Sequence, residues 1–147
     1  MTTTAQTALA DQLAAAVAHA SREHRQIARH IGAPLRKAPH HPWLSAQLSI
    51  IVNALTEGTA RLCPHITAAP TVLHSAAWAP GDLVCSACIR ALSPSDAEDS
   101  TCDRCRRPAR PIYPGMAHAG VLLLSYGLCR RCARRTGLGS LPAEART

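Results

Sequence analysis

Six of the seven cysteines occur in three Cys-x-x-Cys pairs, Cys85/Cys88, Cys102/Cys105 and Cys129/Cys132. A Cys-x-x-Cys turn places two thiolates at two corners of a tetrahedron, and a pair from a distant segment completes a closed zinc site. The second and third pairs meet this requirement, because residues 106–128 between them are enough for a hairpin. The sequence therefore predicts a zinc site formed by Cys102, Cys105, Cys129 and Cys132.

A second zinc site is predicted from Cys85 and Cys88 together with Cys63 and His65. This set brings the total to eight ligands, the number that two tetrahedral ions need. His74 is an alternative to His65, because the one-residue spacing between Cys63 and His65 is tighter than in a usual zinc knuckle. The order of ligands along the chain favours sequential pairing of the ligand pairs, while a crossed pairing stays open.

Both predicted sites have the same order along the chain, with two ligands in a turn, then a hairpin, then two ligands that open a short helix. The hairpins are predicted over residues 71–84 and 112–125, and the helices over 85–92 and 129–137. This order resembles the treble-clef group of zinc-binding folds over residues 63–136. The resemblance implies two structural zinc ions held by tandem treble-clef-like modules.

Two amphipathic helices are predicted ahead of these sites. Residues 5–31 carry apolar side chains at three-, four- and seven-residue spacings, and Gly32 provides the C-terminal stop. His24 lies within this apolar stripe and is expected to be a partly buried structural histidine. A second helix is predicted over 42–55, after a proline-rich link. We expect these helices to form a hairpin that hides each apolar stripe against the other helix or against a partner.

The predicted fold is a small, metal-stabilised α+β protein. Its expected parts are a helical hairpin (1–58), a first zinc module (59–93), an acidic linker (94–100), a second zinc module (101–137) and a frayed tail (138–147). Aromatic residues make up only 3% of the 147 residues and Phe is absent, so the usual bulky core fillers are scarce. Bound metal is expected to supply stability that so small an apolar core lacks.

No apolar run approaches the length that a membrane span needs, and the leucine-rich run at residues 121–124 is far too short. The first residues carry no basic side chain of the kind that opens a secretory signal. We therefore expect a cytoplasmic protein with no membrane partner. In a reducing compartment, closely paired cysteines favour metal binding over disulfides.

Catalysis is not expected from these residues, and neither is a small-molecule substrate. Catalytic zinc keeps an open position, whereas eight ligands close both predicted sites. None of the eight histidines is followed two residues later by Glu, so the zinc-deaminase signature is absent. Two minor alternatives are an iron–sulfur cluster and a redox-active Cys129/Cys132 pair flanked by arginines.

Basic residues gather around the second predicted zinc site. The formal net charge is +7, but ionised thiols and bound zinc would reduce it, so the distribution of charge matters more than the total. Arginine makes bidentate contacts with phosphate, and the predicted contact residues are Arg104, Arg106, Arg107, Arg130, Arg131, Arg134 and Arg135. We expect a regulator associated with DNA or RNA. The alternatives are a merely solvated basic face and a zinc-scaffolded adaptor whose helical hairpin binds a protein partner or forms a homo-oligomer.

Overall fold

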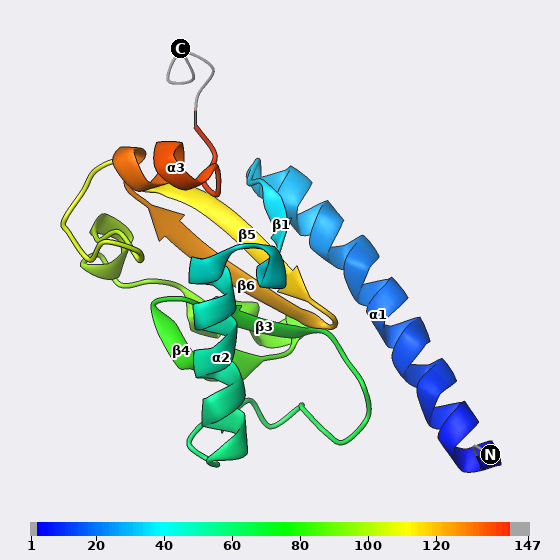
Figure 1. Ribbon diagram of the computed structural model, residues 1–147. Coiled ribbons are helices and arrows are strands. Elements are labelled where there is room, and N and C mark those ends of the chain that lie inside the picture. The colour runs from blue at the N-terminus through cyan, green and yellow to red at the C-terminus, as the bar shows by residue number, and fades with distance from the viewer. Residues whose placement is uncertain (1–2, 142–147) are drawn as a thin grey trace.

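The computed structural model describes residues 3–141 of the chain. A single six-stranded sheet lies at the centre of this mixed α+β fold, with helices on both of its faces (Figure 1). The strands follow the order β1-β5-β6-β3-β4-β2, and their bounds are β1 (Leu35–Lys37), β2 (Arg61–Leu62), β3 (Leu73–Ala76), β4 (Ala79–Val84), β5 (Tyr113–Ala119) and β6 (Leu122–Leu128). The helices are α1 (Thr4–Ile31), α2 (Pro42–Thr56) and α3 (Arg130–Thr136), with 3₁₀ helices η1 (Ala38–His40), η2 (Ser86–Leu92) and η3 (Glu98–Ser100).

Both predicted hairpins are present, and they are joined into one sheet. The first one turns at residues 77–78, whereas the predicted turn at residues 79–82 is wrong because those residues belong to β4. β3 pairs with β4 and β5 pairs with β6, both in antiparallel fashion. β3 also runs parallel to β6, with Leu73 facing Leu122 and Ala76 facing Ser125. The buried Ser75 strengthens this junction, because its hydroxyl donates a 3.1 Å hydrogen bond to the carbonyl oxygen of Leu123. The hairpins predicted for two tandem modules therefore share one hydrogen-bonded sheet.

Helix α1 begins and ends where local signals predict. Thr3 and Gln6 form a capping box at its start, and Gly32 ends it with a φ of 72°. Its C-terminal half packs on β1 and β5 and buries Ala20, His24 and Ala28. Its N-terminal half extends beyond the sheet (Figure 1).

The predicted helical hairpin is wrong, because α1 and α2 pack on opposite faces of the sheet. Successive strand residues alternate between faces. α1 covers the face that carries Met116 and Leu123, whereas α2 covers the face that carries Ala117 and Leu124. The link between the helices forms β1, which pairs in parallel with β5 and leads the chain from one face to the other. Each helix therefore packs only part of its apolar stripe on the sheet, through Ala20 and Ala28 of α1 and through Leu44 and Ile51 of α2.

The main core lies beneath α2. Leu44 and Ile51 of α2 pack there with Leu83, Leu128 and Tyr126 of the sheet. Trp43 meets Tyr126 edge to face, with ring centroids 5.3 Å apart. The core is therefore built mostly from aliphatic side chains, and the scarcity of aromatic residues in the sequence does not prevent it from forming.

The predicted frayed tail is wrong for residues 138–141, while residues 142–147 lie outside the described residues. Leu138 is buried, and its carbonyl oxygen accepts a 2.8 Å hydrogen bond from the Tyr126 hydroxyl. A Cβ atom at Gly115 would collide with the Leu138 carbonyl and the Tyr126 ring. Glycine at this position lets the segment after α3 pack on the sheet.

Within the described residues, no helix is long and apolar enough to span a membrane.

Candidate metal centres and arginine surface

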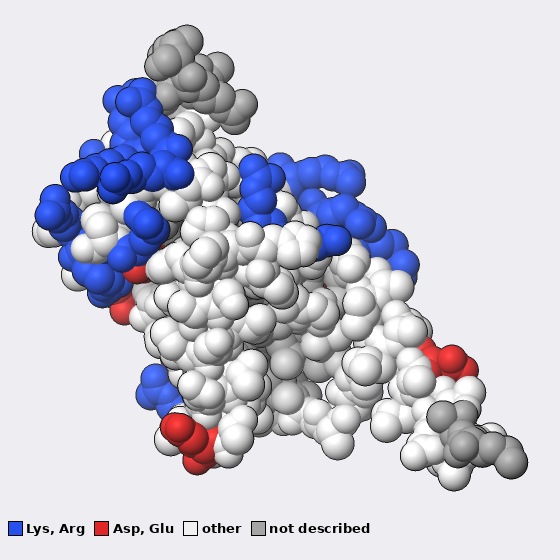
Figure 2. All heavy atoms as spheres, in the orientation of Figure 1, with Lys and Arg blue, Asp and Glu red and all other residues white. Residues whose placement is uncertain are grey.

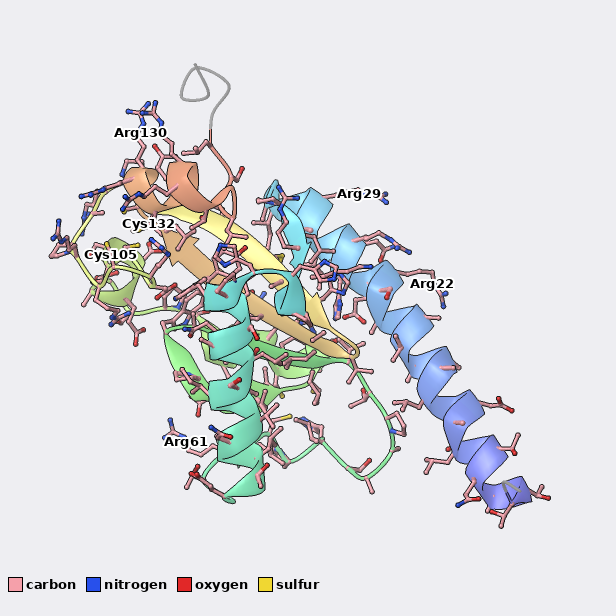
Figure 3. The ribbon with its side chains drawn as sticks, in the orientation of Figure 1. Arg22, Arg29, Arg61, Cys105, Arg130 and Cys132 are labelled. Carbon is pink, nitrogen blue, oxygen red and sulfur yellow. The ribbon has the colours of Figure 1, made fainter. Side chains whose placement is uncertain are left out.

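The cysteines of the second predicted site converge at one end of the sheet. Cys102 and Cys105 lie in the turn before β5, Cys129 caps the start of α3, and Cys132 lies in the first turn of that helix. The four Sγ atoms lie within 4.8 Å of one another. Figure 3 shows Cys105 and Cys132 approaching from the turn and from the helix. This Cys102 group could hold one metal ion.

Backbone hydrogen bonds fold the turn that carries Cys102 and Cys105. The N–H of Arg106 donates to the Cys102 carbonyl at 2.9 Å, and the N–H of Cys102 donates to the Arg107 carbonyl at 3.0 Å. Closing the turn puts Arg106 in the left-handed region, with a φ of 62°. Asp103 fixes the turn to β6, because its Oδ2 accepts a 2.7 Å hydrogen bond from the Gly127 N–H.

The thiols of the Cys102 group differ in acidity. Burial alone would raise the pKa of Cys102, but backbone N–H groups at the site outweigh it and lower this pKa to about 7. Burial raises the pKa of Cys132 to about 12, although the Arg104 guanidinium lies 3.6 Å from its sulfur. Thiols that share one small site cannot all ionise without a compensating positive charge. A bound cation would provide that charge.

A second ligand group joins the β2 side of the sheet to η2. His65 Nδ1 lies 3.2 Å from Cys88 Sγ and 3.8 Å from Cys85 Sγ. The Cys85 N–H points at Cys63 Sγ at 3.3 Å. All four ligand atoms lie within 4.8 Å of one another, so this Cys63 group could also hold one metal ion.

The structure brings together His65, and not the alternative His74, with the three cysteines of the Cys63 group. His74 lies on β3 with its Nε2 atom 3.0 Å from Ser86 Oγ and 3.8 Å from Glu23 Oε1. The first ligand pair along the chain joins the second, and the third joins the fourth, so the pairing is sequential and not crossed. No other group of three or more His, Cys, Asp or Glu side chains converges within residues 3–141.

The arginines predicted to bind phosphate form one surface around the Cys102 group, which we call the α3 surface. All seven are exposed, namely Arg104, Arg106, Arg107, Arg130, Arg131, Arg134 and Arg135. Figure 2 shows Lys and Arg side chains gathered at the α3 end of the molecule. Four of them line a cavity of about 350 Å³ beside the cysteines, namely Arg104, Arg107, Arg131 and Arg135. The nearby Asp103 carboxylate is buried and lies 3.6 Å from Arg106, so it does not cover the other arginines.

A second basic surface, which was not among the predicted sites, lies on α1 and β1. It consists of Arg22, Arg25, Arg29, Arg36 and Lys37, and we call it the α1 surface. The three arginines of α1 recur at helical spacing, a signal present in the sequence. Arg36 and Lys37 lie in the segment predicted to be only a link. The pairing of β1 with β5 puts Lys37 on the face that α1 covers, whereas Arg36 lies on the other face at the same edge and reaches the end of α3.

His24, His74 and His118 form a cluster beneath α1, and only the role of His24 was predicted from the sequence. His24 is completely buried, and its ring centroid lies 6.0 Å from that of His118 on β5. Burial is the main cause that lowers the pKa values of His24, His74 and His118, and it takes His24 to about 4. The expectation of a structural role for His24 agrees with its burial.

Comparison of the chain with protein-family models, with curated proteins and with solved structures gave no match.

Proposed function

We propose that each ligand group holds one structural zinc ion in a treble-clef-like arrangement. A four-cysteine set and a three-cysteine, one-histidine set are donor sets typical of structural zinc. In each group two ligands precede a hairpin and two follow it at the start of a helical segment. That order supports the treble-clef description of both sites.

We also propose that the protein is not an enzyme and has no small-molecule substrate. Four protein ligands complete a tetrahedron, so neither ion would keep the open position that zinc needs to activate water. Cysteine pairs that bind zinc without forming disulfides are typical of a reducing compartment, which supports a cytoplasmic location.

The proposed function is nucleic-acid binding in a regulatory role, through the α3 surface. The observation that carries this proposal is the cavity lined by Arg104, Arg107, Arg131 and Arg135. Arginine side chains that converge on one concave site favour an anion with several oxygen acceptors, and a phosphodiester backbone is such an anion. Zinc would act there as a scaffold that fixes the turn and α3 relative to each other.

A salt-dependent binding assay with matched charge reversals tests this function. Zinc-loaded protein is titrated into labelled random duplex DNA and RNA at several salt concentrations. Arg130→Glu should lower the affinity roughly fivefold and reduce the salt slope by about one. Arg130 is the first residue of α3, where a carboxylate is favourable for the helix, so the fold should be kept.

Arg61→Glu is the matched control, because it changes the net charge equally and lies far from α3 (Figure 3). Arg61 belongs to β2 and pairs with Asp82 at 2.7 Å. We expect this variant to bind nucleic acid nearly as well as the unaltered protein. Equal losses in both variants, or no binding by the unaltered protein at low salt, would contradict the proposed function.

A protein-interaction adaptor is the second candidate, and exposed apolar side chains favour it. Leu9 and Leu13 on the projecting half of α1 are 60% and 50% exposed. Ile50, Val52 and Leu55 on α2 are also exposed. A protein partner that covered these side chains would remove substantial apolar surface from water.

A further inference from the structure

The α1 surface carries positive charge that no carboxylate in the described part of the chain neutralises through an ion pair. Arg22, Arg25 and Arg29 lie on the side of α1 away from the buried Ala20 and Ala28. Figure 3 shows Arg22 and Arg29 extending away from the sheet. The one acidic residue among them, Glu23, turns inward and accepts a 2.6 Å hydrogen bond from Ser86.

The α1 and α3 surfaces are direct neighbours. Arg36 of β1 donates a 3.3 Å hydrogen bond to the carbonyl oxygen of Gly137, the residue that ends α3. A cavity of about 720 Å³ lies between α1 and α3, lined by Gly32, Pro34 and Arg36 on one side and by Arg134, Gly137 and Ser140 on the other. In Figure 2 an uncharged strip separates the two blue areas. Two basic surfaces thus flank one concave strip of mostly small residues.

We propose that the α1 and α3 surfaces form one interface for duplex nucleic acid, with each surface contacting one of the two backbones. This inference rests on the proposed function and adds the class of nucleic acid. A duplex presents two rows of phosphates separated by a groove, which matches two basic surfaces separated by an uncharged strip.

Single-stranded nucleic acid fits this face less well. Proteins that bind single strands combine a basic groove with aromatic side chains on which bases stack. None of the four aromatic residues of the chain belongs to either basic surface or lines the cavity between them. Tyr126 is buried, Trp43 packs on it, and the Trp78 indole donates to the Leu92 carbonyl at 2.8 Å.

Neutralising the α1 surface separates this inference from the proposed function. The variant Arg22→Gln, Arg25→Gln, Arg29→Gln keeps good helix formers at exposed positions. Its control is Arg61→Gln, Arg90→Gln, Arg110→Gln, with the same loss of charge outside both surfaces. Each protein is titrated into duplex DNA, duplex RNA and single-stranded DNA of equal length across a salt series, after circular dichroism and zinc content have verified the fold.

We expect the α1 variant to bind duplexes about tenfold more weakly, with a salt slope reduced by about two to three. Its affinity for single-stranded DNA should change less than twofold, and the control should bind duplexes nearly as well as the unaltered protein. Unchanged duplex binding, an equal loss for single strands, or an equal loss in the control would overturn the inference. If Arg130→Glu still weakens binding in those cases, the proposed function stands without the α1 surface. The two duplex arms report whether DNA or RNA is preferred.

Discussion

Arg106 occupies a backbone conformation that suits glycine better than arginine. Its φ of 62° lies in the left-handed region, which costs a non-glycine residue on the order of 1 kcal/mol. The ion pair between the exposed Arg106 guanidinium and the buried Asp103 carboxylate, at 3.6 Å, offsets only part of that cost. The turn around Cys102 and Cys105 therefore stores strain at one position.

Arg106→Gly should stabilise the zinc-loaded protein by about 0.5 kcal/mol, because relief of strain outweighs the added freedom of the unfolded chain. The measurement is the urea midpoint of unfolding at constant zinc concentration. Arg107→Gly is the control, since Arg107 has no positive φ and should only lose stability. A lower midpoint for Arg106→Gly than for the unaltered protein would show that the turn is not strained there.

His24 makes the stability of the fold dependent on pH. Burial, reinforced by His118 and His74 and opposed by Glu23, lowers the pKa of His24 from 6.5 to about 4. The folded state thus binds the proton less readily than the unfolded state. The stability that neutral His24 contributes is complete above about pH 6.5 and is lost as the pH falls through about 4.

We expect His24→Leu to remove this dependence, which amounts to roughly 3 kcal/mol between pH 7 and pH 4. Urea unfolding of both proteins at each pH measures the difference. Metal release at low pH affects both proteins alike and cancels from that difference. A gap between the two stabilities that is independent of pH would mean that the pKa of His24 is the same in the folded and unfolded states.

At the scale of elements, local signals account for what the sequence predicted. Gly32 and Gly137 end α1 and α3 with positive φ, and Pro42 starts α2, as the sequence indicated. The β5–β6 hairpin follows from the turn at Gly120 between two short apolar stretches. These features depend on a few neighbouring residues, so sequence patterns were sufficient to place them.

Non-local pairing accounts for what the sequence could not predict. β1 has three residues and no alternating pattern, so its parallel pairing with β5 depends on partners about eighty positions away. Without β1, nothing in the sequence indicated that α1 and α2 lie on opposite faces of the sheet.

The same limit applies to the candidate sites. The spacing of His65 and His74 left both open as ligands, and only the pairing of β3 shows that His74 faces α1.

At the scale of the whole molecule, the parallel pairing of β3 with β6 joins the two candidate metal centres through one sheet. The Cys63 group is attached to the β3–β4 hairpin and the Cys102 group to the β5–β6 hairpin. Structural zinc contributes on the order of 10 kcal/mol in small domains, which is comparable to the usual stability of a whole fold. Loss of either ion should therefore destabilise the sheet as a unit.

We expect chelation to unfold residues 63–136 in one cooperative transition. Hydrogen exchange followed by mass spectrometry should show β3 and β6 losing protection together as metal is withdrawn. Cys105→Ser, which removes one ligand from the Cys102 group only, should likewise expose β3 amides. Persistent protection of the β3–β4 hairpin after confirmed loss of metal from the Cys102 group would show that the centres are independent.

The shared sheet also constrains how the chain is made. Synthesis proceeds from the N-terminus, so β3 and β4 leave the ribosome before β6 exists. During that interval the side of β3 that later pairs with β6 is an open edge, able to pair with another nascent chain. A fragment that ends before β6 would keep this edge permanently. Neither hairpin is therefore expected to fold as an independent unit. Truncation between the two hairpins should yield aggregates rather than a smaller folded protein.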